Sequence, residues 1–132
     1  MLPARQAMLA DALAEMEGDV ALWVEGSDEA LAAPDLVVLQ ELQPRLKVRR
    51  RSASLDPWLP TERYPLYRLG PVDQPDMARA GFVGFPEGFM LDALCDLAVA
   101  ISRGDSLASP LARETLASLA RDVELRILTS PG

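Results

Sequence analysis

The residue types that most often carry catalysis are scarce in this sequence of 132 residues. It contains no histidine, which removes imidazole general bases, Ser-His-Asp triads and nearly all zinc sites. Cys95 is the single cysteine, so neither an internal disulfide nor a CxxC redox pair can form within these residues. The sequence therefore predicts no catalytic constellation, no metal site and no cofactor.

Cys95 and a small acidic group are the remaining candidates for chemistry. Apolar residues lie about one helical turn on either side of Cys95, which favours a buried, unreactive thiol over a redox sensor or an intermolecular disulfide. Glu25, Asp28 and Glu29 can steer a partner or raise one another's pKa. Without a histidine or a metal ligand beside them, solvated helix capping, with Ser27 as the cap, is the favoured interpretation.

Composition and charge narrow the class of protein further. The chain is 49% hydrophobic and 25% charged, as in a soluble protein with one domain. Its net charge of −7 argues against nucleic acid, whose phosphates select basic surfaces. No apolar run approaches the ~20 residues that span a membrane, and the N-terminus does not resemble a signal peptide. We therefore expect a cytoplasmic location and no membrane partner.

Two further features could belong to a binding surface. Arg49-Arg50-Arg51 is the one basic cluster, and we interpret it as an exposed strand end rather than as a contact for an acidic partner. Trp23 lies inside an apolar run and is predicted to be in the core. Trp58 lies between prolines in a loop and is the better interface candidate, because loops carry binding residues and tryptophan is common at hot spots.

The elements that must position these residues follow from periodicity and turn signals. Helices are predicted over residues 3–16, 27–42, 88–104 and 109–120, and strands over 20–24, 46–49, 66–69, 82–85 and 123–127. Pro34 must either kink the second helix or begin a later one. A helix between the first two strands implies a parallel crossover, and a short link between the next two implies a hairpin.

This order predicts an α/β, thioredoxin-like fold. Its mixed four-stranded sheet (β-α-β, then β-β-α) is expected to have helices on both faces. An extra helix precedes the sheet, and a helix and a strand follow it at the C-terminus.

One segment adds a family resemblance to this reading. YPLYRLGPVDQPDMARAGFVGFPEGFMLDAL, from Tyr64 to Leu94, resembles part of the first thioredoxin unit in two related families. These are the N-terminal domain of the alkyl hydroperoxide reductase flavoprotein subunit (the F subunit) and the two-unit, glutaredoxin-like protein disulfide oxidoreductases. In them a proline precedes a short strand, and a G-x-P-x-G turn opens a long helix. Here these are Pro65 and Gly84 to Gly88. ELQPRLKV and LARETLASLARDVELRILTSPG extend the resemblance over most of the chain.

The resemblance implies a division of the chain into two parts. Residues 1–104 correspond to a thioredoxin-like unit that lacks CxxC, and residues 105–132 to a linker helix and the first strand of a possible second unit. In the relatives that strand runs into the active CxxC. The chain is then either a piece of a longer protein, which we favour, or a degenerate relative that stops at Gly132.

The resemblance also implies where a partner would bind. It places the lost CxxC at Gly26-Ser27-Asp28-Glu29. Pro65, after Tyr64, corresponds to a proline that thioredoxin-like domains hold in the cis form near the redox helix, and this loop either docks an extended partner chain or only shapes the fold. The family's turn is followed by His-Glu, whereas this chain has Phe89-Met90, and Glu87 is only a weak substitute for that glutamate.

We therefore expect a non-catalytic structural or docking unit of a thiol–disulfide relay, not an enzyme. Its partner would be another protein or a following thioredoxin unit, linked by resemblance to a peroxiredoxin. Two alternatives remain open: a stand-alone adaptor or chaperone, and a fragment of a dithiol oxidoreductase whose CxxC lies just beyond Gly132. An unpaired C-terminal strand would also allow a homodimer by edge pairing.

Overall fold

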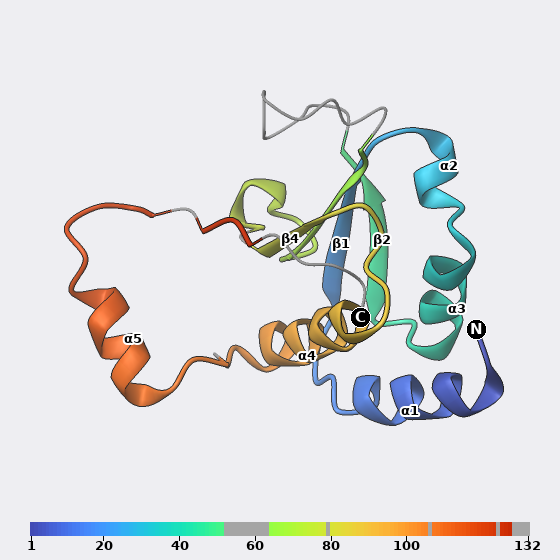
Figure 1. The fold of residues 1–132 in the computed structure, drawn as a ribbon, viewed down its shortest axis with the longest axis horizontal. Helices are drawn as coiled ribbons and strands as arrows, with labels where there is room; N and C mark the ends of the chain where they lie inside the picture. The colour runs from blue at the N-terminus through green and yellow to red at the C-terminus, as the bar shows by residue number, and fades with distance from the viewer. Residues whose placement is uncertain (52–63, 79, 106, 124, 128–132) are drawn as a thin grey trace.

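The computed structural model describes residues 1–51, 64–78, 80–105, 107–123 and 125–127. Its elements follow one another along the chain as α1 (Pro3–Leu13), β1 (Val20–Glu25), α2 (Asp28–Leu31), α3 (Pro34–Leu42), β2 (Leu46–Arg50), β3 (Leu66–Gly70), the 3-10 turn η1 (Pro75–Met77), β4 (Ala80–Val83), α4 (Phe89–Arg103) and α5 (Pro110–Ala117). Figure 1 shows the sheet beside α1, α3 and α4, with α5 standing away from it.

The four strands form one mixed sheet in the order β2-β1-β3-β4. β1 and β2 are parallel, because the chain between them crosses over through α2 and α3. β3 is antiparallel to both β1 and β4. The predicted α/β architecture, β-α-β followed by β-β-α, is therefore confirmed.

Alternation along the strands divides the sheet into two chemically different faces. Val20, Leu22 and Val24 of β1 join a single buried core with the apolar sides of α1, α3 and α4. The residues between them and their cross-strand neighbours point the other way. We call this side the second face; it consists of Ala21, Trp23, Glu25, Lys47, Arg49, Leu66, Arg68, Gly81 and Val83.

The expectation of helices on both faces is wrong for the described part of the chain. α1 contacts both α3 and α4, and all three contribute to the same core. The second face carries Arg49, which is exposed and whose charged end favours water over a covering helix. The β3–β4 connection gives this face partial cover, since Trp23 Nε1 donates to the Pro71 carbonyl oxygen at 3.1 Å. Trp23 is therefore half-buried here instead of lying in the core.

The crossover between β1 and β2 is broken into two helices at Pro34. Pro34 occupies the first turn of α3, where its missing N–H leaves no bond unmade. In one continuous helix, that N–H would have bonded to the Ala30 carbonyl oxygen. The Tyr67 hydroxyl takes its place and donates to the Ala30 oxygen at 3.0 Å. A residue of β3 thus holds α2 over the sheet.

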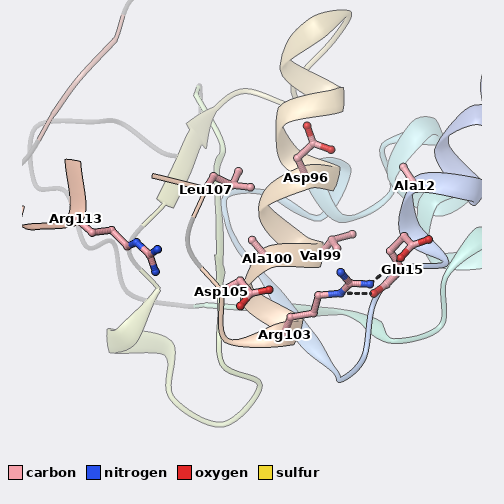
Figure 2. A pocket seen from close by; sticks show the side chains of 9 residues that line it. All are labelled: Ala12, Glu15, Asp96, Val99, Ala100, Arg103, Asp105, Leu107 and Arg113. Carbon is pink, nitrogen blue, oxygen red and sulfur yellow. Dashed lines mark hydrogen bonds and ion pairs between the residues drawn. The ribbon is translucent and has the colours of Figure 1, made fainter. Parts of the chain in front are cut away.

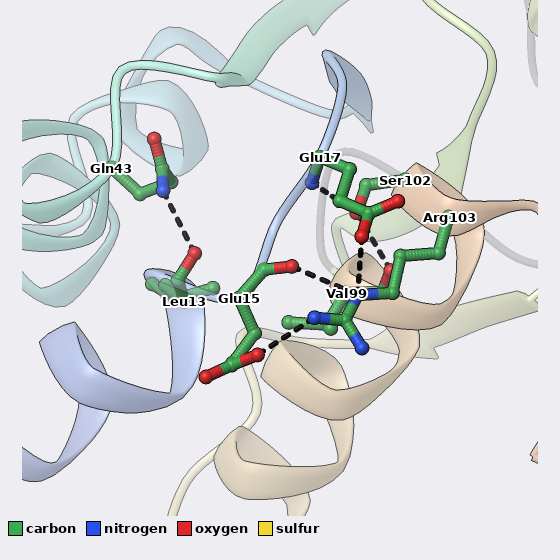
Figure 3. A network of polar contacts seen from close by, with 7 residues as sticks. All are labelled: Leu13, Glu15, Glu17, Gln43, Val99, Ser102 and Arg103. Atoms are coloured by element: carbon green, nitrogen blue, oxygen red, sulfur yellow. Dashed lines mark hydrogen bonds and ion pairs between the residues drawn. The ribbon is translucent and has the colours of Figure 1, made fainter.

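A polar network joins the helix ends where β1 begins (Figure 3). The Arg103 guanidinium donates to the Glu15 carbonyl oxygen at 3.0 Å and to the Glu15 carboxylate at 2.7 Å. Gln43 donates to the Leu13 carbonyl oxygen at 2.8 Å. These bonds supply partners for carbonyl groups that a helix end leaves open, and they join α1 to α3 and α4.

The C-terminal segment does not join the sheet. Ser109 caps α5 by accepting a hydrogen bond from the Ala112 N–H at 3.1 Å, but α5 has no buried residue. The strand predicted over residues 123–127 is a wrong prediction for the described residues: Val123 is 58% and Ile127 81% exposed, and neither lies in a strand. An extended segment becomes a strand only when a neighbour satisfies its backbone groups, and no such neighbour lies in the described sheet.

Candidate functional site

The ends of three adjacent strands meet at one edge of the sheet. Glu25 of β1 pairs with Leu66 of β3, and Leu66 pairs with Val83 of β4. The Gly84 N–H donates to the Pro65 carbonyl oxygen at 2.7 Å. Residues 26–29, which follow β1, therefore begin beside Pro65. We call the segments Glu25–Glu29, Tyr64–Pro65 and Gly84–Gly88 the site edge.

The stretch Ser27-Asp28-Glu29, part of the segment where the family resemblance predicts the redox pair, is exposed and carries two acidic residues. Ser27 takes the N-cap position of α2, but its side chain makes no capping hydrogen bond, so the predicted cap is only positional. Asp28 forms an ion pair with Arg50 of β2. Glu29 is exposed. The predicted solvated acidic group is thus confirmed for Asp28 and Glu29.

Glu25 behaves differently from its two acidic neighbours, and sequence reasoning missed this. It is 1% exposed, with Oε1 3.3 Å from Nε of Arg51. Arg51 also bonds to the Asp76 carboxylate at 2.8 Å. The sequence did offer one signal for this. Side chains alternate between the two faces along a strand, so Glu25 is expected on the same face of β1 as Trp23.

The docking candidates are placed unevenly. Tyr64 is 44% exposed, Pro65 is half-buried beside Gly84, and Glu87 is exposed in the turn before α4. Trp58 lies outside the described residues. The predicted cis bond before Pro65 is wrong, since the described residues contain no cis peptide. The trans form is the ordinary state of X-Pro bonds, and it already lets the Pro65 carbonyl continue the β3–β4 ladder.

Two glycines shape the turn between β4 and α4. Gly84 has φ +77°, and Gly88 has φ +54° and ψ −130°. A side chain is strained in such conformations. Pro86 between them is buried. Both glycines of the G-x-P-x-G pattern are therefore explained by the backbone, because each has a positive φ that favours glycine.

Gly84→Ala should lower the free energy of unfolding by about 1–2 kcal/mol. No atom lies within 4 Å of the added Cβ, so the loss would come from the backbone alone. Urea denaturation measures it. Gly18→Ala is the matched control, because its Cβ meets only the Ser102 carbonyl oxygen at 3.4 Å and should change stability by less than about 0.5 kcal/mol. Equal losses in the two variants would contradict the backbone explanation.

The single thiol lies away from the site edge, within the core. Cys95 on α4 is 1% exposed. Burial, followed by the charges of Asp92 and Asp96, raises the pKa of its thiol to about 12, against a smaller opposing effect of Arg5. This confirms the predicted buried cysteine. Thiolate chemistry at neutral pH has no support at this position.

A shallow cleft of about 450 Å³ lies elsewhere, between α1, α4 and the segment that enters α5 (Figure 2). It is lined by Glu15, Asp96 and Asp105 as well as by Arg103 and Arg113. Its charges have both signs, and Arg103 already bonds to Glu15. The cleft does not touch the site edge. The described residues contain no cluster that could hold a metal ion and no helix long and apolar enough to cross a membrane.

The sheet order and its connections form a thioredoxin-like fold. The chain is similar to the crystal structure of a protein disulfide oxidoreductase from Aeropyrum pernix K1, with a TM-score of 0.65 and 18% sequence identity. The match covers 89% of this chain and 55% of that one, so this chain spans about half the length of the structure it matches. No protein-family model and no curated protein matches the sequence.

Proposed function

We propose that this chain is a non-catalytic thioredoxin-like unit that serves structure and docking within a thiol–disulfide relay. One observation carries the proposal. The single thiol, Cys95, is buried in the core, and no residue of Gly26-Ser27-Asp28-Glu29, where the family resemblance predicts the redox pair, carries a sulfur. Disulfide exchange needs an accessible thiolate, so contact is the role left to this edge.

The surface around Pro65 supports a docking role. Tyr64 precedes Pro65, Glu87 follows Gly84, which bonds to Pro65, and both side chains are exposed. Exposed loop residues on a rigid sheet are common binding positions. The similarity to a protein disulfide oxidoreductase supports a relay as the setting. Within the same proposal, this chain corresponds to the first unit of the alkyl hydroperoxide reductase F subunit. The relay would then pass its electrons to a peroxiredoxin.

A second candidate function has its own support. Leu111 is 73%, Leu125 79% and Ile127 81% exposed, which is unusual for apolar side chains in one segment and often marks an interface. A following thioredoxin unit would bury them. In that case the chain is the first half of a dithiol oxidoreductase whose CxxC lies beyond Gly132.

An insulin-reduction assay with a dithiol reductant tests the proposal. The chain should reduce insulin no faster than the reductant alone, whereas a thioredoxin with CxxC, run as the positive control, should accelerate it. Turnover above background would overturn the non-catalytic role. The codons after Gly132 in the encoding gene then separate the settings: C-x-x-C supports a relay unit or an oxidoreductase half, and a stop codon supports a stand-alone adaptor.

A further inference from the structure

The second face carries a compact group of positive charge around one tryptophan. Trp23 pairs in register with Arg49 on β2 and with Arg68 on β3. Lys47 lies two residues before Arg49 on β2 and therefore on the same face, about 6.6 Å away along the strand. Arg49 and Arg68 thus flank Trp23 from the two strands beside β1, and Lys47 adds a third cation further along the same face of β2. We call Trp23, Lys47, Arg49 and Arg68 the basic patch.

These three cations lack the ion pairs that most other basic residues of the folded body form. Lys47, Arg49 and Arg68 form no ion pair with any residue in the described part of the chain, and the Arg49 guanidinium bonds only to its neighbour's carbonyl oxygen. Other basic side chains there are paired: Arg5 with Asp92, Arg50 with Asp28, Arg51 with Glu25 and Asp76, and Arg103 with Glu15 and Glu17. Arg45 donates to the Glu17 carbonyl oxygen.

The Arg68 side chain lies close to β4 and is partly buried. A Cβ on Gly81 would come within 3.1 Å of Arg68 Cγ, so the missing side chain at Gly81 leaves room for the Arg68 stem to pass over β4. Its Nε is buried and has no hydrogen-bond partner among the described residues. A guanidinium that is partly withdrawn from water attracts an anion more strongly than a fully solvated one.

We propose that the basic patch binds an acidic, extended segment of a partner protein. Carboxylates two residues apart on an extended chain have the same spacing as Lys47 and Arg49, so alternate acidic side chains could meet both. Trp23 offers an apolar surface between Arg49 and Arg68. The inference goes beyond the role proposed for the site edge and does not depend on it.

The net charge of the chain favours a protein over a nucleic acid as the partner of the basic patch. The chain as a whole has a net charge of −7, which repels a long polyanion, and phosphate binding depends on many basic contacts. The basic patch supplies only three cations. A short acidic segment needs no more, because charge-assisted hydrogen bonds are individually strong.

The test uses a fluorescein-labelled peptide of alternating Glu and Thr, and the same peptide with Gln for Glu, followed by anisotropy at low ionic strength. The native chain should bind the Glu peptide, more weakly as salt rises, and should not bind the Gln peptide. The triple substitution Lys47→Gln, Arg49→Gln and Arg68→Gln should weaken binding by about tenfold or more. Arg49→Gln alone, at an exposed position, should weaken it measurably even if the triple variant unfolds.

The matched control is Arg113→Gln, Arg121→Gln and Arg126→Gln, which changes the net charge equally at exposed C-terminal positions and should bind as the native chain does. Circular dichroism confirms that each variant is folded. If both triple variants bound the Glu peptide equally weakly, the loss of affinity would come from the change in net charge alone, and the inference would be overturned. Failure of the native chain to bind the Glu peptide, or tighter binding of a single-stranded oligonucleotide, would also overturn it. Lys47 and Arg49 would then serve only to keep the edge strand β2 from pairing with another chain.

Discussion

Cys95 in the folded chain should react with iodoacetamide at pH 8 about 10³-fold more slowly than an exposed cysteine. Its pKa of about 12 leaves a thiolate fraction of about 10⁻⁴ at that pH, against about 0.2 for an ordinary cysteine. Only the thiolate attacks the reagent. Closure of the core around the sulfur, which is 1% exposed at the residue level, would slow the reaction further.

The reference thiol for this measurement can be placed at the site edge itself. Ser27→Cys combined with Cys95→Ala gives a chain with one cysteine at an exposed position, and its rate should be ordinary. Mass spectrometry follows both reactions, and guanidinium should restore the ordinary rate to Cys95. If Cys95 reacted as fast as the introduced thiol, this chain would hold an accessible sulfur, and the proposed non-catalytic role would fail.

The same burial makes stability depend on pH in a defined direction. The folded state holds the Cys95 proton more tightly than the unfolded chain does, because its pKa is raised. The associated stability is complete below about pH 8.5 and is lost as the pH rises toward 12, by up to about 1.4 kcal/mol for each pH unit. The pKa of Tyr67, raised by burial, adds a loss of the same sign above about pH 10. Urea midpoints between pH 8 and 10 should fall in the native chain and stay flatter in Cys95→Ala.

Glu25→Ala should lower the free energy of unfolding by about 3 kcal/mol. Glu25 is buried, and its Oε1 lies 3.3 Å from Arg51 Nε. The side chain of Arg51 is itself only 15% exposed. Without the Glu25 carboxylate, the positive charge of Arg51 would be less well neutralised at a position with little access to water. This uncompensated buried charge is the main cost of removing one member of a buried ion pair.

Glu29→Ala is the matched control, since Glu29 is an exposed acid four residues further along the same edge. It should change stability by less than about 0.5 kcal/mol. A double-mutant cycle with Arg51→Ala then isolates the pair, and a coupling above about 1 kcal/mol is expected. If Glu25→Ala cost no more than Glu29→Ala, the pair would not hold the second face together.

Local signals predicted most of the elements correctly. The apolar run at 20–24 forms the central strand, Ser109-Pro110 begins α5, and Gly104, with φ +68°, follows the end of α4. Each depends on residues within a turn or two of the position concerned. The final strand failed for the opposite reason, because alternation describes a candidate strand and pairing requires a partner elsewhere.

Residue identity by itself determined the chemical limits of this chain. A lone cysteine in an apolar helical stripe and the absence of histidine follow from the sequence, and so does the prediction that the thiol is buried. Only the tertiary structure decided which charges are compensated. Within Arg49-Arg50-Arg51, Arg50 forms an ion pair with Asp28 and Arg51 with Glu25. Arg49 forms no ion pair among the described residues and lies opposite Trp23 on the neighbouring strand. Ion pairing depends on side chains brought together from distant parts of the chain, and this approach is not encoded in any local pattern.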